Sequence, residues 1–267
     1  MSTLILQLSD LHLWAEPEGE VRGLNTRDSL RTVLDAVRAG GGDYDRVVVT
    51  GDFTHDERRE TYQVARAMLA DWLDRCDVLP GNHDERVLMR EVFEEQAGGS
   101  DQGICFSRAA GGWRLIGVDT HVPGKVPGRV EPAMLDWLQG ELQQHATEPT
   151  IIFQHHPPTQ VDSPWLDGIG LQEPEPYREL IRSSPQVRVV SCGHVHQESA
   201  SSLGSSVVLT VPSTSVQFVP MNATAEADTA SPGYRVFALD DPGDSDATAV
   251  GWSTRVIRVP RTHVAGE

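Results

Sequence analysis

Five apolar runs of this chain each end at residues whose side chains bind metal ions well. These residues all lie just after a hydrophobic segment and are, in chain order, Asp10 with His12, Asp52, Asn82 with His83 and Asp84, His155 with His156, and His194 with His196. Runs such as LILQL and RVVVT have the length and aliphatic content of buried strands. Loops that leave the carboxyl ends of neighbouring strands in an α/β sheet meet in one crevice, so we expect these side chains to meet there.

The chemistry of the donor atoms indicates hydrolysis of a phosphate ester. The set offers imidazole nitrogens, carboxylate oxygens and one amide oxygen, and no cysteine takes part, which disfavours a structural zinc site. Asp10 and His12 are two residues apart, so on an extended segment their side chains share one face. There are more candidate ligands than one tetrahedral ion needs. Our hypothesis is that Asp52 bridges two ions about 3.5–4 Å apart, as is usual in two-metal phosphatases.

Some histidines and tryptophans keep two interpretations. His155 and His156 are adjacent, and the H-x-P spacing favours His155 as the ligand, with His156 packing or hydrogen-bonding nearby. For His55, which follows Asp52, a surface or packing role is favoured over a contact with substrate. His121 also follows an apolar run, but no matching ligand lies beside it. Trp14 and Trp165 could stack a nucleobase, and packing is at least as good an explanation for each.

The order of the motifs resembles that of the calcineurin-like metallophosphoesterases. The matching motifs are D-x-H at residues 10–12, G-D at 51–52, G-N-H-D at 81–84, H-x-P at 155–157 and G-H-x-H at 193–196. A closer similarity to the bacterial class III 3′,5′-cyclic-AMP phosphodiesterases lies in SPWLD (163–167), CGHVHQE (192–198), PSTSVQF (212–218) and SPGYR (231–235). This resemblance implies a four-layer αββα sandwich and a centre of two metal ions, Fe2+/Fe3+ or Mn2+, with Zn2+ also compatible with the donors.

The resemblance also implies a role for each residue. One ion would be held by Asp10, His12, Asp52 and His196, and the other by Asp52, Asn82, His155 and His194. His83 would be catalytic, and Asp84 would support catalysis by fixing the orientation of His83 or of a neighbouring loop. The substrate would contact Asn82, His83, His194 and His196.

The expected function is hydrolysis of 3′,5′-cyclic AMP to 5′-AMP. A hydroxide that bridges the two ions would attack phosphorus in line, and His83 would protonate the departing 3′-oxygen. The alternative is a broader phosphodiesterase that acts on glycerophosphodiesters, 2′,3′-cyclic nucleotides or other small diesters. The loops around 14–25, 121–130, 159–175 and 213–235 would distinguish the two. A non-catalytic scaffold on the same fold is disfavoured because the full ligand set and His83 are present.

Composition limits the partners and the location. The chain has 267 residues, with 22 basic and 39 acidic side chains and a net charge of −17, which repels nucleic acid. We therefore expect a small-molecule substrate, a cyclic nucleotide or another phosphodiester. The 3 cysteines have no matched spacing, and no signal peptide or long apolar stretch occurs, which favours a cytoplasmic protein without a membrane partner. We expect a monomer or a homodimer.

Apolar patterning predicts an α/β (α+β) chain of two mixed sheets flanked by helices. Strands are expected near residues 3–8, 46–50, 76–79, 104–108, 114–118, 150–154, 187–191, 206–211, 234–239 and 249–258. Helices are expected over residues 26–39, 56–73, 86–96, 131–145 and 176–183, with Thr26 capping the first. We expect a single domain over residues 1–267, with a motif-bearing core at 1–200 and a β-rich C-terminal part at 201–260.

Overall fold

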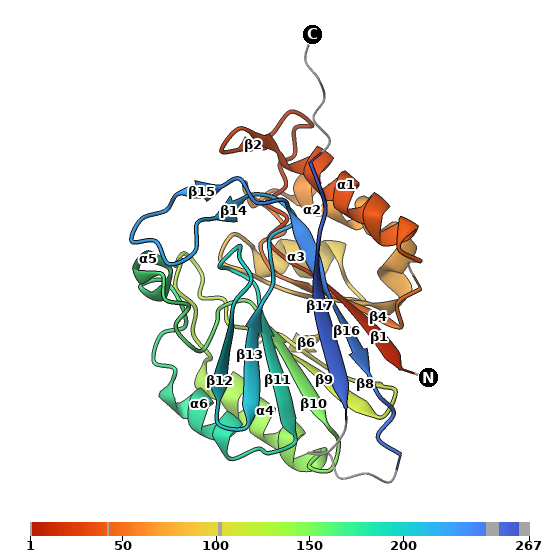
Figure 1. The fold of residues 1–267 in the computed structure, drawn as a ribbon, viewed down its shortest axis with the longest axis vertical. Helices are drawn as coiled ribbons and strands as arrows, with labels where there is room; N and C mark the ends of the chain where they lie inside the picture. Colours follow the sequence, from red (N-terminus) through yellow and green to blue (C-terminus); the bar gives the residue numbers. More distant parts are fainter. Residues whose placement is uncertain (1, 42, 101–102, 244–250, 262–267) are drawn as a thin grey trace.

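The computed structural model describes residues 2–261 except 42, 101–102 and 244–250. Two β-sheets lie face to face, and helices cover the outer face of each (Figure 1). The structure is therefore the four-layer αββα sandwich that the sequence predicts. No helix among the described residues is long and apolar enough to cross a membrane.

The first sheet is mixed. Its strands, in spatial order, are β17 (Trp252–Arg258), β16 (Gly233–Leu239), β1 (Thr3–Leu8), β4 (Arg46–Thr50) and β5 (Cys76–Leu79). β1, β4 and β5 are parallel, whereas β16 runs antiparallel to both β1 and β17. The outer face is covered by α1 (Thr26–Ala39), α2 (Arg59–Met68) and α3 (Arg86–Val92), and the 3₁₀ helix η1 (Ala70–Arg75) leads into β5. Two strands from the C-terminal part thus complete a sheet that begins at the N-terminus.

The second sheet contains six strands. They are, in spatial order, β12 (Ala200–Leu203), β13 (Ser206–Thr210), β11 (Val187–Cys192), β10 (Thr150–Gln154), β9 (Trp113–Val118) and β8 (Phe106–Ala110). β9, β10, β11 and β13 are parallel, and the antiparallel strands β8 and β12 form the edges. The helices α4 (Pro132–Gln144) and α6 (Glu175–Arg182) pack on its outer face.

Short elements occupy the loops between these layers. They are the hairpin of β2 (Glu20–Val21) and β3 (Leu24–Asn25), the pair β6 (Gly99–Ser100) and β7 (Gly103–Ile104), the pair β14 (Gln217–Phe218) and β15 (Ala227–Asp228), and the helix α5 (Pro164–Asp167). The β2–β3 hairpin, the β14–β15 pair and α5 lie at the end of the sandwich where β1 and β11 terminate (Figure 1).

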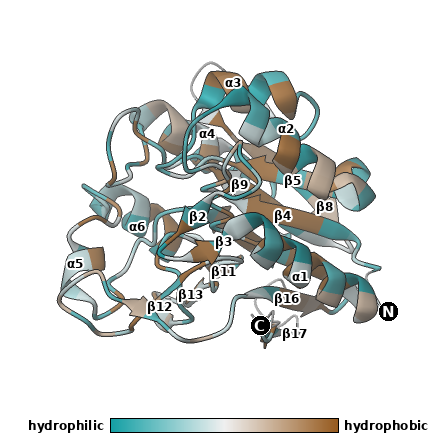
Figure 2. Cartoon of the chain, turned by 90° about the horizontal axis from the view of Figure 1, so that it is seen from above, coloured by the Kyte–Doolittle hydropathy of each residue, from teal (hydrophilic) through white to brown (hydrophobic). Residues whose placement is uncertain are grey.

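Alternation along the strands divides the core into layers. On β1, Ile5 faces the second sheet, whereas Leu6 and Leu8 face the helices α1–α3. Phe153 and Phe237 meet between the sheets, with ring centroids 6.0 Å apart. Figure 2 shows β4 as almost wholly hydrophobic and α1 as a mixture of hydrophilic and hydrophobic residues. That difference is expected, because β4 is buried on both faces and α1 on one only.

Several element boundaries differ from the sequence-based expectation. Thr26 is wrong as the cap of the first helix, because the Oδ1 of Asn25 accepts the Asp28 N–H at 2.9 Å. The helix expected over 56–73 is α2 followed by η1, and the third helix ends at Val92. The strand β12 and the three short strand pairs were not predicted, because their few residues leave no clear period. The organisation as one domain stays a prediction.

Candidate metal centre

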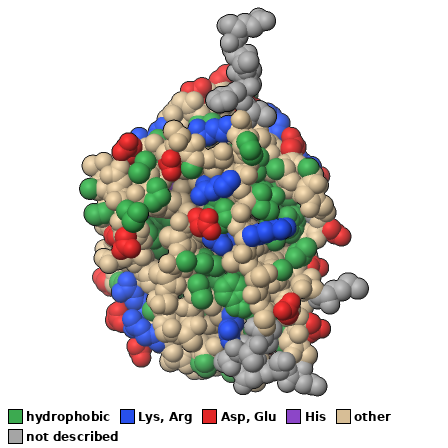
Figure 3. Space-filling model, viewed as in Figure 1, with side chains coloured by type: hydrophobic (Ala, Val, Ile, Leu, Met, Phe, Trp, Pro, Cys, Tyr) green, Lys and Arg blue, Asp and Glu red, His purple; other side chains and the backbone are tan. Residues whose placement is uncertain are grey.

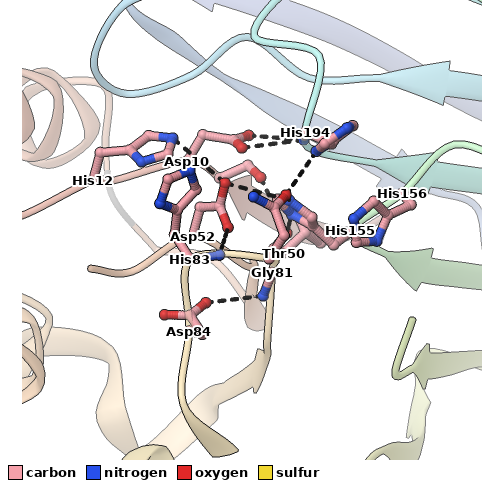
Figure 4. Close-up of polar contacts among 12 residues, drawn as sticks. Asp10, His12, Thr50, Asp52, Gly81, His83, Asp84, His155, His156 and His194 are labelled. Carbon is pink, nitrogen blue, oxygen red and sulfur yellow. Dashed lines mark hydrogen bonds and ion pairs between the residues drawn. The ribbon is translucent and has the colours of Figure 1, made fainter. Parts of the chain in front are cut away.

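The candidate ligands lie at the carboxyl ends of strands from both sheets. Asp10 and Asp52 follow β1 and β4 in the first sheet, and His155 and His194 follow β10 and β11 in the second. Asn82 follows β5. Figure 4 shows these segments converging on one group of side chains. The sandwich therefore brings together five chain segments that are far apart in the sequence.

The turns that carry these residues are tight. Asp10, Asp52 and His194 have φ values of 57°, 54° and 70°, in the left-handed region that most side chains avoid. At Gly81, a Cβ atom would come within 2.2 Å of the Asp52 Oδ1. Strained backbone and a close glycine approach together indicate that this region is built to hold particular side chains.

The first group of ligands consists of Asp10, His12, Asp52 and His196. Their candidate ligand atoms all lie within 4.8 Å of one another. The Nδ1–H of His196 donates to the Val216 carbonyl at 2.7 Å, which leaves Nε2 as the nitrogen with a free lone pair. That Nε2 lies 3.0 Å from the Nε2 of His12 and 3.4 Å from the Oδ1 of Asp10. These four side chains can therefore share one cation.

The second group surrounds His155. Its Nδ1–H donates to the Thr50 carbonyl at 2.7 Å, so Nε2 faces the site. The Nε2 of His155 lies 3.2 Å from the Asn82 Oδ1, which is itself 2.9 Å from the Nδ1 of His194. The Asp52 Oδ2 lies 3.4 Å from the His155 Nε2 and 3.5 Å from the His12 Nε2. Asp52 therefore lies between the two groups, where a bridging carboxylate is required.

His156 has no free nitrogen for a metal ion. Its Nδ1 lies 2.8 Å from the Thr120 hydroxyl, and its Nε2 lies 3.0 Å from the Val126 carbonyl. The geometry therefore favours His155 as the ligand, as the H-x-P spacing does. His156 instead fixes the loop that contains Val126.

The electrostatics of the group match what divalent cations need. Burial alone would raise the pKa of Asp52, but His155 and His12 hold it well below its usual value. Burial lowers the pKa of His194 to about 3, so this imidazole is neutral at pH 7. Burial also lowers the pKa of His12 well below its usual value. Ionised carboxylates beside neutral imidazoles are the ligand states that metal binding requires. His155 differs, because burial alone would lower its pKa but Asp52 outweighs burial and raises the pKa to about 9, so this imidazole must lose a proton before it binds metal.

One further observation supports a fit to metal. Asp10 and Asp52 are 0% and 2% exposed, and two buried carboxylates this close together are stable only with nearby positive charge. The donor set of oxygen and nitrogen atoms is suited to a centre of two ions.

His83 lies beside this group. Its backbone N–H donates to the Asp52 Oδ1 at 2.9 Å, and its ring meets that of His12 edge-on, with centroids 4.9 Å apart. The ring also stacks on His55, with centroids 5.0 Å apart and planes at 14°. Both rings line a cavity of about 240 Å³ that includes Asp52 and Asn82. His83 is thus positioned to contact a molecule bound at the ligands.

Asp84 is held in the loop below His83. Its carboxylate accepts the Phe53 N–H at 3.1 Å, the Gly81 N–H at 2.9 Å and the Tyr62 hydroxyl at 3.1 Å. Burial, with a smaller contribution from Asp52, raises its pKa to about 7. Of the two roles expected for Asp84, these contacts favour fixing the loop, which makes it a positioning residue.

Some residues of the cavity were not singled out from the sequence. Arg22, Val126, Ile169 and Phe218 line it, as does Trp165, which had been considered. His55 lines it too, packed against His83 and Trp14. The sequence indicated a possible substrate contact for His55 only through its position just after the G-D motif. His121 is buried and is absent from the described lining of the cavity, and burial lowers its pKa to about 4.

Comparison with known proteins identifies the family. Residues 3–198 match the model of the calcineurin-like phosphoesterases. The chain belongs to this family. A relative named 3′,5′-cyclic adenosine monophosphate phosphodiesterase CpdA, from Pseudomonas aeruginosa, is 35% identical over 91% of this chain and 87% of its own length. A 3′,5′-cyclic-nucleotide phosphodiesterase from Nostoc, alr5338, is 31% identical over 96% of this chain and 92% of its own length.

Solved structures of other proteins share the fold. A dimetal phosphatase from Danio rerio matches with a TM-score of 0.67 and 16% identity, covering 97% of this chain and 99% of that one. A purple acid phosphatase from yellow lupin matches with a TM-score of 0.62 and 14% identity, covering 97% of this chain and 54% of that one. At these identities the likeness concerns the fold alone.

Proposed function

We propose that this chain is a metal-dependent phosphodiesterase that hydrolyses 3′,5′-cyclic AMP to 5′-AMP. The observation that carries the proposal is the position of Asp52 between two groups of ligands, beside a cavity that His83 lines. The names of the two relatives described above support a cyclic nucleotide as the substrate.

Two divalent cations fit the ligand groups. Asp10, His12, Asp52 and His196 would hold one, and Asp52, Asn82, His155 and His194 would hold the other. When bound, such ions supply Lewis acidity for the phosphoryl oxygens and an activated water. Iron or manganese suits this mixed nitrogen and oxygen set, and zinc is also compatible with it.

The chain's own residues orient the substrate and move the proton. His83 lines the cavity, and we assign it the role of general acid, which would protonate the departing 3′-oxygen, rather than that of a metal ligand. The side-chain amide of Asn82 would donate to a phosphoryl oxygen, and His194 and His196 would border the same phosphate. Asp84 would keep the G-N-H-D turn rigid, so that His83 needs no rearrangement before it reacts.

The alternative substrates are glycerophosphodiesters, 2′,3′-cyclic nucleotides or other small diesters. We favour a small molecule over a nucleic acid because the net charge is −17 and the cavity measures only about 240 Å³. We further propose that the protein acts in the cytoplasm, as a monomer or a homodimer, without a membrane partner.

A substrate panel tests the proposal. Protein loaded with Mn2+ or Fe2+ would be assayed against 3′,5′-cyclic AMP, 2′,3′-cyclic AMP and glycerophosphocholine, with products separated by chromatography. We expect 5′-AMP from the first at the highest kcat/KM, and no turnover from an Asp52→Ala variant that lacks the bridging carboxylate. Fast hydrolysis of either other diester beside negligible turnover of 3′,5′-cyclic AMP would contradict the proposal.

A further inference from the structure

The cavity beside the candidate ligands has a lining of mixed chemical character. Besides carboxylate, amide and imidazole groups, the lining contains apolar side chains and one arginine. The residues of this second kind that matter here are Val126, Trp165, Ile169, Phe218 and Arg22. A phosphodiester with an aromatic group at its other end would match both kinds of lining residue.

Arg22 is held at the cavity by a strained turn. Arg22 and Gly23 join β2 to β3, with φ values of 50° and 78°. Positive φ at both central residues is the pattern of a type I′ hairpin turn, whose first position favours Asn or Gly. An arginine in that position costs on the order of 1 kcal/mol in the backbone. A residue kept there despite this cost is a candidate for a side-chain function.

Phe218 links the guanidinium of Arg22 to the metal centre. The Cζ of Arg22 lies 5.7 Å from the centroid of the Phe218 ring. That ring in turn stacks on the candidate ligand His196, with centroids 4.6 Å apart and planes at 29°. The guanidinium is therefore separated from the ligand group by a single aromatic ring. Arg22 lines the same cavity as Asp52 and Asn82, so a substituent on a phosphate bound at the ligands would lie in the cavity that Arg22 borders.

The guanidinium of Arg22 keeps its hydrogen-bond donors free. The side chain of Arg22 makes no hydrogen bond or ion pair with any described residue. The neighbouring Arg27, by contrast, donates to the Trp14 carbonyl. The indole of Trp165 meets Phe218 edge-on, with centroids 4.9 Å apart, and its buried Nε1–H has no partner among the described residues.

We propose that Arg22 recognises the purine base of a cyclic nucleotide and thereby determines substrate specificity. A planar guanidinium can stack on a base and donate to the N7 of adenine, or to the N7 and O6 of guanine. This inference rests on the proposed function, because it assumes that the phosphate binds at the metal ligands.

Matched variants and substrates test this role. Arg22→Ala and Arg22→Lys would be compared with Arg31→Ala, which removes an exposed arginine of α1 that pairs with Asp28 outside this cavity. The substrates are 3′,5′-cyclic AMP and methyl ribofuranoside 3′,5′-cyclic phosphate, which has the same diester ring without a base. We expect Arg22→Ala to lower kcat/KM for cyclic AMP about tenfold, mainly through KM, because base contacts are present before the reaction.

The other combinations distinguish base recognition from attraction of the phosphate. Turnover of the base-free ester should stay within about twofold in Arg22→Ala. Arg22→Lys should restore little of the loss, because lysine keeps the charge without the planar group. Arg31→Ala should behave as the wild type. An equal loss with both substrates, or full rescue by lysine, would instead assign Arg22 to phosphate attraction and overturn the inference.

A binding measurement makes the inference independent of turnover. Calorimetric titration of metal-loaded protein with 5′-AMP and with ribose 5-phosphate compares the same phosphate with and without a base. The Arg22→Ala variant should bind 5′-AMP about tenfold more weakly than the wild type, and its affinity for ribose 5-phosphate should be unchanged. Unchanged affinity for 5′-AMP would overturn the role of Arg22. Failure of the wild type to hydrolyse cyclic AMP would contradict the proposed function alone, because this titration still decides about Arg22.

Discussion

The residues of the proposed centre divide into the expected metal ligands and the residues that would act beside them. His83 stacks on His55 and approaches His12, and it lines the cavity while its backbone is fixed by Asp52. A general acid must contact the leaving group without being a ligand itself. This division leads to two predictions at the scale of single residues.

The first prediction concerns His83. His83→Ala should retain the metal content of the wild type and lower kcat on cyclic AMP about 10²–10⁴-fold, because proton transfer to the leaving 3′-oxygen is lost. With bis(p-nitrophenyl) phosphate the loss should be much smaller, since p-nitrophenolate leaves without protonation. Elemental analysis and steady-state kinetics measure both. His145→Ala, at the end of α4, is the control. Equal losses with both substrates would remove His83 as the general acid.

The second prediction concerns the proton on His155. Burial alone would lower its pKa, but Asp52 outweighs burial and raises it from 6.5 to about 9 in the metal-free protein. A metal ion must displace this proton, so metal affinity should rise with pH up to about 9. Calorimetry at pH 7.5 in buffers of different ionisation enthalpy should detect about one proton released per centre filled.

The same shift has a consequence for folding. The pKa of His155 is raised in the folded state, so its stabilisation of the metal-free protein is fully present below pH 6.5 and is lost as pH rises through about 9. A His155→Asn variant should lose both this pH dependence and the proton release. Proton release that persists in this variant would assign the proton to another ligand.

At the scale of the elements, the strand ends position the centre through close backbone contacts. Gly81→Ala would place a Cβ 2.2 Å from the Asp52 Oδ1 and 2.5 Å from the Asp52 nitrogen. We expect a loss of about 1–3 kcal/mol in the free energy of unfolding, as for other overpacked sites, together with weaker metal binding. Urea unfolding and elemental analysis measure the two effects.

Gly140 provides the matched control for this prediction. It lies within α4, and a Cβ there would meet nothing within 4 Å. Gly140→Ala should therefore stabilise the protein by about 0.4–1 kcal/mol, because alanine favours helix and restricts the unfolded chain. A Gly81→Ala variant with the stability and metal content of the wild type would show that the turn at residue 81 has room to adjust.

The sequence predicted the elements that carry the centre better than the elements that surround it. β1, β4, β5 and β10 were expected at the bounds observed, because their apolar runs are buried on both faces. The two-residue strands beside the cavity leave no periodic pattern. Arg22 and Phe218 meet only because β2 and β14 are brought together by the tertiary fold, so no spacing in the sequence could indicate their contact.

At the scale of the whole molecule, the overall charge opposes the proposed substrate. The net charge is −17, yet a cyclic nucleotide is a monoanion. Acidic and basic side chains are interspersed on the face drawn in Figure 3, so the negative charge is not gathered there in one patch. The repulsion is then a long-range effect of the summed charge of the whole protein, whereas bound metal ions would attract the phosphate only at short range.

Salt should therefore speed the capture of substrate. Raising NaCl from 0.01 M to 0.15 M shortens the Debye length from about 30 Å to about 8 Å, which screens the distant acidic groups and leaves the ligands in contact with the phosphate. We expect kcat/KM for cyclic AMP to rise by about twofold with kcat unchanged, because salt changes only the rate at which substrate and protein associate. Steady-state kinetics at several concentrations of NaCl and of a second salt, sodium acetate, measure the effect. A fall in kcat/KM with both salts would mean that local positive charge extends far enough to outweigh the whole acidic surface.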